Sequence, residues 1–152
     1  MTRAWTAHPL RWVYAPSCEL DRFRCFKRYA DAADRPGGRG KLIYMEHPTV
    51  IRPADHADWR SDKMGKTTLF QSPRLLVGLN AFEPGQFHAL HTHTGMDKVY
   101  QVVEGDGVFL LDGRELPMTA GDLLIAPDGV PHGVRNTGTG RLLLLAILAP
   151  AP

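Results

Sequence analysis

Short apolar runs separated by glycine and proline turns follow one another along the chain from Arg74, and they constrain its fold most. The predicted strands lie at 74–82, 98–104, 108–111, 114–116, 122–126 and 141–148. Asp112-Gly113 is a two-residue loop that suits a type I′ hairpin. The run 141–148 is apolar almost throughout, which predicts a strand buried on both faces. Strands this short, with turns at this spacing, indicate an all-β sandwich or barrel.

Composition and charge change at Met45, and this change predicts the domain organisation. Residues 1–44 hold nine Lys/Arg against four Asp/Glu, whereas residues 45–152 hold nine against twelve. The first segment has no sustained period of 2 or 3.6 and ends in a glycine-rich stretch at 34–40. We expect 1–44 to be a basic, loosely ordered extension, 45–66 a lead-in segment and 67–150 the β domain. Two explanations of the extension stay open: Met45 is the biological start, or residues 1–44 are a genuine arm.

Several partner classes are disfavoured by the same composition. The arginines of residues 1–44 are scattered and form no basic helix face or aromatic platform, which argues against nucleic-acid binding. The longest apolar run, Leu142–Ala149, is far shorter than the roughly 18 residues of a membrane span. The start of the chain lacks a signal peptide's apolar stretch, and Cys18 and Cys25 read as two free thiols. We therefore expect a cytoplasmic protein that binds neither nucleic acid nor membrane.

Three of the seven histidines occupy informative positions. His91 and His93 are two residues apart, so on a strand both side chains point to one face, with Cα atoms roughly 6–7 Å apart. Two imidazoles at that separation can share a metal ion at about 2.0–2.2 Å per nitrogen. His132 follows a tight turn that contains Pro127, Gly129 and Pro131. Each of these signals is weak when it is taken alone.

Together with the flanking glycines and prolines, the histidines resemble a known family. Residues 85–93 read Gly-x5-His-x-His and are followed by Gly105, which is similar to the first motif of the cupin superfamily. Residues 121–136 read Gly-x5-Pro-x-Gly-x2-His-x3-Asn and resemble the second cupin motif at every one of these positions. The likeness to small single-domain bacterial cupins covers residues 67–150. It implies a six- to eight-stranded jelly-roll barrel, or double-stranded β-helix, with His91, His93 and His132 binding a metal inside one end.

One position departs from the family pattern. Cupins often supply a Glu ligand separated by six residues from the glycine that is Gly105 here, and this chain has Lys98 at that position. Asp97 is adjacent, but on the opposite strand face unless a bulge re-aims it. Three interpretations remain: a three-histidine site with open positions, a site completed by Asp97 through a shifted register, or a site that has lost its metal.

The neighbours of this site receive separate expectations. Lys98 either extends outward to pair with Glu104 or another acid, which we favour, or faces inward to hold an anionic substrate. Tyr100 shares the strand face of Lys98, so Lys98 and Tyr100 are the candidate catalytic, substrate-orienting residues. His88 lies three residues before His91, and strand alternation predicts that it points away from the metal. Asn136 is interpreted as structural.

These residues favour a metal-dependent oxygenase, or a related enzyme, that acts on a small oxygen-chelating organic molecule. Three neutral imidazoles suit a divalent transition metal such as Fe, Mn, Ni, Co or Zn. The alternative is a non-enzymatic module that binds metal or a small ligand, because one fold hosts many functions. A third possibility, sugar isomerase or epimerase chemistry, would need an acid/base pair in the barrel. A β domain of this size with strand 141–148 buried on both faces further predicts a homodimer.

Overall fold

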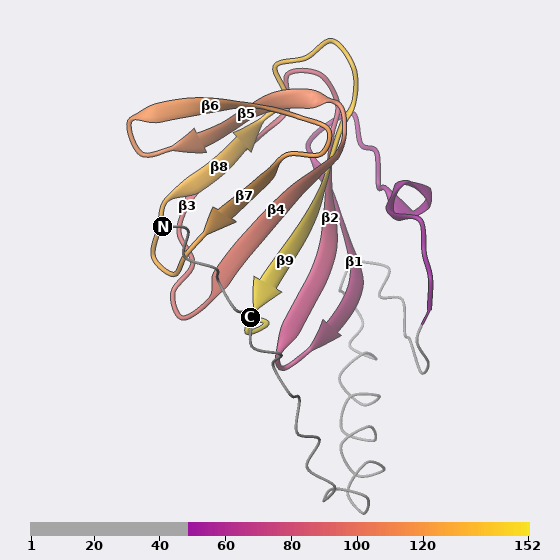
Figure 1. The fold of residues 1–152 in the computed structure, drawn as a ribbon. Coiled ribbons are helices and arrows are strands. Elements are labelled where there is room, and N and C mark those ends of the chain that lie inside the picture. The colour runs from indigo at the N-terminus through magenta and orange to yellow at the C-terminus, as the bar shows by residue number, and fades with distance from the viewer. Residues whose placement is uncertain (1–48) are drawn as a thin grey trace, which may run out of the picture. The chain divides into compact units, whose positions relative to one another are not determined.

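The computed structural model describes residues 49–152, so the predicted extension at 1–44 lies outside the described part of the chain. Within this range, one turn of 3-10 helix, η1 (Pro53–His56), precedes nine strands (Figure 1). The strands are β1 (Gly65–Ser72), β2 (Leu75–Phe82), β3 (Phe87–His91), β4 (Asp97–Glu104), β5 (Asp106–Leu111), β6 (Arg114–Thr119), β7 (Leu123–Ala126), β8 (His132–Arg135) and β9 (Leu142–Ala149). No helix among residues 49–152 is long and apolar enough to cross a membrane.

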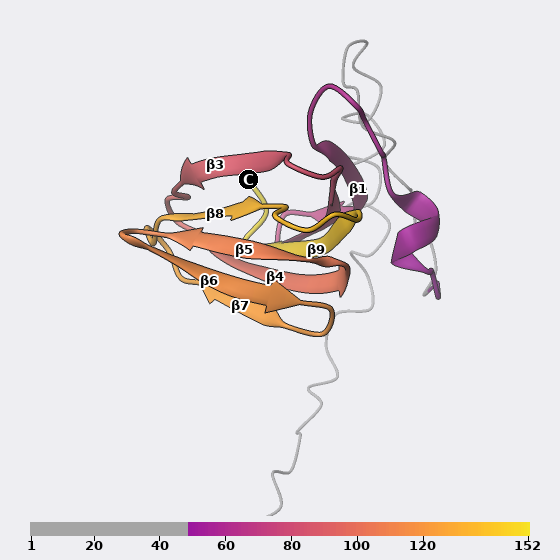
Figure 2. The same cartoon turned by 90° about the horizontal axis from the view of Figure 1, so that it is seen from above.

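The strands form two antiparallel sheets that face each other, as Figure 2 shows from above. One sheet has the order β1-β2-β9-β4-β7 and the other the order β3-β8-β5-β6. The all-β prediction is therefore confirmed. The closed barrel is not, because no strand of one sheet pairs with a strand of the other among residues 49–152. The chain crosses between the sheets through turns instead, for example at Gly105 between β4 and β5, where φ is +84°.

A buried apolar core lies between the two sheets. Phe82, Tyr100, Phe109, Val134 and Leu142 are among its members, and none of them is more than 4% exposed. Burial of each large apolar side chain stabilises the fold by about 1.5–3 kcal/mol. Because Tyr100 and Val134 come from the strands that also carry Lys98 and His132, this core fixes the two strands beneath the candidate site.

Strand β9 is buried on both faces, as the sequence predicts. Leu142 and Leu144 join the core between the sheets, while Leu143 packs in a second cluster on the outer face of the five-stranded sheet. Ile51 and Trp59, from the lead-in segment before β1, pack against this outer cluster. The chain thus covers part of the outer face of its own sheet, and the burial of β9 does not by itself require a second subunit.

Several local predictions differ from the structure. Strand β1 begins at Gly65, two residues before the predicted start of the β domain, and the strands predicted from the sequence do not include β1, β3 or β8. The β5–β6 hairpin is not type I′, which needs positive φ at both central residues. Gly113 has φ +71°, but no residue other than glycine has a positive φ in residues 49–152, so Asp112 does not.

The boundary at Met45 stays a prediction and can be tested directly. A chain that begins at Met45 should fold and keep the metal content of the full chain, since Ile51, Trp59 and both clusters lie after that point. Thermal unfolding and metal analysis of the shortened and full chains would check this. Aggregation or loss of metal would show that residues 1–44 belong to the fold.

Candidate metal centre

Two strands of the four-stranded sheet, β3 and β8, and the loop that follows β3 bring three histidines together. His91 ends β3 and lies opposite His132, the first residue of β8, while His93 follows two residues after His91. The candidate ligand atoms of His91, His93 and His132 all lie within 4.8 Å of one another. The group predicted from the sequence is therefore assembled in space, and it can hold a metal ion.

Backbone carbonyls set the orientation of two of these rings. His91 Nδ1 lies 2.8 Å from the carbonyl oxygen of Ala89, and His132 Nδ1 lies 2.8 Å from that of Val130. A carbonyl oxygen can only accept, so each Nδ1 carries the hydrogen and each Nε2 keeps a lone pair, as a metal ligand requires. His132 Nε2 is buried and has no hydrogen-bond partner, which is the state expected of an atom that serves as a ligand.

Hydrogen bonds between two loops hold His93 in place. The backbone N–H of Gly129 donates to the His93 carbonyl at 2.9 Å, and the N–H of Gly95 donates to Asp128 Oδ1 at 2.7 Å. Gly95 and Gly129 both have positive φ, at +76° and +73°, which glycine adopts without strain. The loop after β3 is thereby fastened to the turn that precedes His132.

Asp97 takes part in the hydrogen bonds to the turn before His132 and is not one of the candidate metal ligands. Its Oδ1 accepts a hydrogen bond of 2.9 Å from the backbone N–H of Asp128, and the residue is exposed. Its neighbour Lys98 pairs in register with Ala126 of β7 and Leu148 of β9, all three buried, so Asp97 takes the opposite face of β4. The shifted register that would turn Asp97 toward the histidines is not observed.

Lys98 faces the histidines, which contradicts the outward orientation favoured from the sequence. Its side chain is only 4% exposed, and its Nζ lies 3.5 Å from His91 Nε2 and 3.3 Å from His93 Nε2. The reason is strand alternation, because Lys98 and the core residue Tyr100 occupy the same face of β4. The ammonium group therefore stands where the family pattern places a carboxylate ligand.

Tyr100 lies below this lysine. The Lys98 Nζ is 4.5 Å from the centre of the Tyr100 ring, and the Tyr100 and His132 ring centres are 6.0 Å apart. Burial raises the pKa of the Tyr100 hydroxyl, and the side chain of Asn80 nearby opposes this shift without making a hydrogen bond of standard geometry. Tyr100 thus closes the inner side of the site with an aromatic ring and an un-ionised hydroxyl.

His88 also belongs to the cluster, although strand alternation predicts the opposite. Its ring centre lies 4.1 Å from that of His91. A register irregularity between His88 and His91 in the β3–β8 pairing shifts the alternation and turns both rings to the same side. The one sequence signal for it is Gly133, since a glycine inside a strand often marks a bulge. A Cβ there would lie 2.8 Å from the His88 carbonyl oxygen and 3.0 Å from Leu90 N.

Burial and neighbouring positive charge keep the histidines neutral. Desolvation, aided by Lys66 and Lys98, lowers the pKa of His88 to about 3, and desolvation with Lys98 lowers that of His93 to about 4. The pKa values of His91 and His132 are also lowered, chiefly by burial. Burial and the nearby Lys66 lower the pKa of Lys98 to about 8. Lys66, which the sequence analysis did not single out, thus adds a second positive charge to the site.

These shifts predict that acid destabilises the fold. Between pH 6.5 and about 3 the unfolded chain binds more protons at His88 than the folded chain, so the free energy of unfolding falls as the pH falls through this window. Between pH 7 and pH 5, protonation linked to His88 should lower the free energy of unfolding by up to about 2 kcal/mol. Solvent screening of this partly exposed residue reduces that figure. Urea unfolding of wild type and His88→Phe at both pH values checks it. An equal fall in the free energy of unfolding between the two pH values in both proteins would contradict the assignment to His88.

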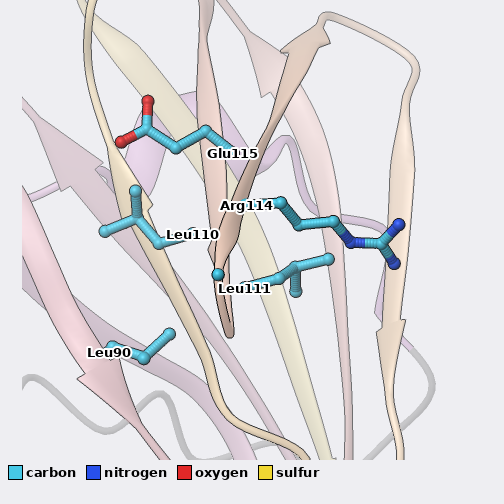
Figure 3. Close-up of a pocket in the computed structure, with 6 residues that line it drawn as sticks. Leu90, Leu110, Leu111, Arg114 and Glu115 are labelled. Atoms are coloured by element: carbon cyan, nitrogen blue, oxygen red, sulfur yellow. The ribbon is translucent and has the colours of Figure 1, made fainter.

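A surface cleft elsewhere offers no comparable chemistry. It has a volume of about 480 Å³ and involves the β5–β6 hairpin and Leu90 of β3 (Figure 3). Its lining residues are Leu90, Leu110, Leu111, Gly113, Arg114 and Glu115. Glu115 is paired with Arg135 at 2.6 Å, and none of the lining residues belongs to the histidine cluster.

The remaining predicted residues behave as expected. Asn136 is buried, and its side-chain amide donates to the carbonyl oxygens of Phe82 and Gly140 at 3.2 and 2.9 Å. Its Oδ1 accepts from Gly138 N at 3.0 Å, so Asn136 is structural. Gly105, Gly121 and Gly129 of the two motifs all have positive φ, a conformation that glycine adopts without strain.

Comparison with known proteins agrees with this geometry. A family model described as a cupin domain matches residues 78–148, which include all three histidines. The oxalate-binding protein of Thermotoga maritima is 32% identical over 85 residues, which cover 56% of this chain and 69% of that protein. Gentisate 1,2-dioxygenase from Ralstonia sp is 32% identical over 78 residues, or 51% of this chain but only 22% of that enzyme.

A solved structure gives the same result. The crystal structure of TT1209 from Thermus thermophilus is similar with a TM-score of 0.64 and 40% sequence identity, covering 68% of this chain and 98% of that one. The fold, the two spaced motifs and the match over most of a curated relative agree, and the chain belongs to the cupin superfamily.

Proposed function

We propose that this cupin holds a divalent transition metal on His91, His93 and His132 and is a metal-dependent oxygenase, or a related enzyme. Its substrate is a small organic molecule that chelates through oxygen. The observation that carries the proposal is the ligand group itself, three imidazoles within 4.8 Å with two Nε2 lone pairs fixed by backbone carbonyls. Imidazole nitrogen suits Fe, Mn, Ni, Co and Zn, so the residues fit such an ion.

When bound, the metal would supply Lewis acidity and a binding position for oxygen ligands. The chain's own residues do the rest. His91 and His132 keep their lone pairs aimed into the site through Nδ1–H bonds to Ala89 and Val130. Lys98 orients the substrate by donating a hydrogen bond from Nζ. Tyr100 limits how far the substrate enters the site and excludes water from the inner side of the site.

The names of two relatives support this choice of substrate. One is an oxalate-binding protein and the other a gentisate 1,2-dioxygenase, so each is named for a small organic acid. The dioxygenase is matched over only 22% of its length, so its activity does not transfer with the likeness. The relatives therefore favour a small oxygen-rich ligand without identifying it.

The test is metal analysis of the purified protein, followed by oxygen-uptake measurements with a panel of diketones, catechols, thiols and small carboxylates such as gentisate. We expect close to one transition-metal ion per chain and substrate-dependent oxygen uptake with at least one compound. His132→Ala is the matched control and should lose both. A metal-loaded wild-type protein that consumes no oxygen with any compound would contradict the oxygenase.

A second candidate is a non-enzymatic module that binds a small ligand. It is favoured by Lys98, whose Nζ lies within 3.5 Å of two Nε2 atoms and so competes with a metal for their lone pairs. Under this alternative the protein binds a small anion in saturable fashion, without oxygen uptake and with no transition metal in the purified protein.

A homodimer remains our prediction, now based on exposed apolar residues of the five-stranded sheet. Leu123 and Ile125 of the edge strand β7 are 54% and 62% exposed, and Ile125 pairs with Val99 of β4. Contact between this face and a second copy of the chain would remove the exposed apolar surface from water. Light scattering at micromolar concentration should report a dimer, and Ile125→Glu should shift it toward monomer, whereas Phe87→Glu on the other sheet should not. A monomeric wild type would refute the dimer.

A further inference from the structure

A buried cation without a counter-ion stands at the centre of the site. Lys98 is 4% exposed, and its Nζ points at His91 Nε2 and His93 Nε2. None of the ion pairs recorded among residues 49–152 involves Lys98, and the adjacent Asp97 is engaged with the backbone N–H of Asp128. An unpaired buried charge is costly, and native structures normally pair it.

The excess of positive charge at the site comes from more than one residue. Lys66 of β1 lies near enough to lower the pKa of Lys98 and of His88, so a second cation adds to the same field. No carboxylate contributes to the pKa shift of Lys98, His91, His93 or His132. A divalent ion on the histidines would increase this excess of positive charge. A ligand that enters the site must therefore bring negative charge with it.

From this geometry we infer that the substrate or ligand carries a carboxylate, which supplies the negative group that Lys98 displaced from the protein. A carboxylate has two oxygens, so one would bind a metal held by the histidines while the other accepts a hydrogen bond from Lys98 Nζ. Charge-assisted bonds of this kind are about twice as strong as neutral ones. Neutral chelators such as oxamide leave Lys98 uncompensated and bind more weakly.

This inference rests on the proposed function, because it concerns the same site, and it names Lys98 as the residue that sets specificity. Anion affinity depends on Lys98 even when the histidines and their metal are intact. Loss of Lys98 should lower the affinity for carboxylates without lowering metal content.

The experiment is calorimetric titration of Zn²⁺-loaded full-length protein with oxalate, glycolate and benzoate, and with oxamide as the neutral analogue of oxalate. We expect wild type to bind at least one carboxylate and to discriminate against oxamide at least tenfold. Lys98→Met should lose at least tenfold in carboxylate affinity at unchanged zinc content. Lys66→Met removes a charge that acts on the site only through its field, without the hydrogen bonds that Lys98 makes to the histidines, so it should lose less.

The outcomes separate the two proposals. If wild type binds none of Fe²⁺, Mn²⁺, Ni²⁺, Co²⁺ and Zn²⁺, the proposed metal centre fails, and the same titrations on the metal-free protein then decide the inference through Lys98→Met alone. If zinc binds but all three carboxylates fail to bind, or Lys98→Met binds them within twofold of wild type, the inference is overturned and the metal centre stands. Equal losses in Lys66→Met and Lys98→Met would also overturn it, because the field and not the Lys98 contact would then set affinity.

Discussion

Lys98→Glu should tighten metal binding by at least tenfold. The change removes an ammonium that lies 3.3 Å from His93 Nε2 and puts a carboxylate at the position where cupins often supply their fourth ligand. At about 4 Å and an effective dielectric of about 20, a pair of unit charges interacts by about 4 kcal/mol. Lys98→Glu replaces a repulsion between the side chain and the metal with an attraction. Even if only part of this interaction is realised, the change exceeds the roughly 1.4 kcal/mol that corresponds to a tenfold change in affinity.

The measurement is Zn²⁺ competition against a chelating dye, and the structure offers matched controls. Lys66→Glu changes the charge by the same amount in the same field but belongs to no ligand group, so its effect should be smaller. Asp97→Ala should leave affinity unchanged, because the Asp97 carboxylate is bonded to the Asp128 N–H. If Lys98→Glu changes nothing and Asp97→Ala weakens binding, Asp97 is the carboxylate ligand after all.

The same variant bears on activity. A fourth protein ligand occupies a position that substrate or oxygen would otherwise use, so oxygen uptake should fall while metal affinity rises. If wild type binds no transition metal and Lys98→Glu restores binding, Lys98 has taken the place of the metal. That result would refute the oxygenase and favour the binding module.

The sequence predicted the parts of the fold that depend on local pattern. Turn residues at short intervals indicate short strands, and the unbroken apolar run at 141–148 predicts a strand buried on both faces, which β9 is. The same argument missed β1, because Lys66, Thr67 and Thr68 give no apolar alternation at its start. In the structure, Thr67 is held by a hydrogen bond from its hydroxyl to the His56 carbonyl at 2.9 Å, a contact between segments that no local pattern encodes.

The site was predicted where motif spacing determines it and missed where backbone register does. His91, His93 and His132 were identified because two spaced motifs name them, and they do converge. His88 was dismissed by strict alternation, which the irregularity between His88 and His91 breaks. Lys98 was placed outward on chemical grounds, because a cation beside a metal is repelled. Strand pairing decides its direction instead, since Ala126 and Leu148 flank it on the inner face.

Replacing any of the three histidines should remove most of the metal. His91→Ala, His93→Ala and His132→Ala should each weaken Zn²⁺ binding by about 100-fold or more, because loss of even an outer-shell partner costs about 10–100-fold. His88→Ala is the informative control. Its ring centre lies 4.1 Å from that of His91, yet it lies outside the ligand group, and His91 Nδ1 keeps its bond to the Ala89 carbonyl without it.

We therefore expect His88→Ala to change affinity by less than about tenfold, below the cost of losing an outer-shell hydrogen-bond partner, because His88 contacts the His91 ring without a hydrogen bond to it. Equilibrium competition with a dye gives the four affinities, and thermal unfolding of each metal-free variant shows whether the fold survives. A loss in His88→Ala as large as in His91→Ala, with the fold intact, would mean that the irregularity in β3 has recruited His88 as a ligand. A loss confined to His91→Ala and His132→Ala would mean that only the two rings anchored by backbone carbonyls bind metal. His93 would then accept a hydrogen bond from Lys98 and not bind the metal.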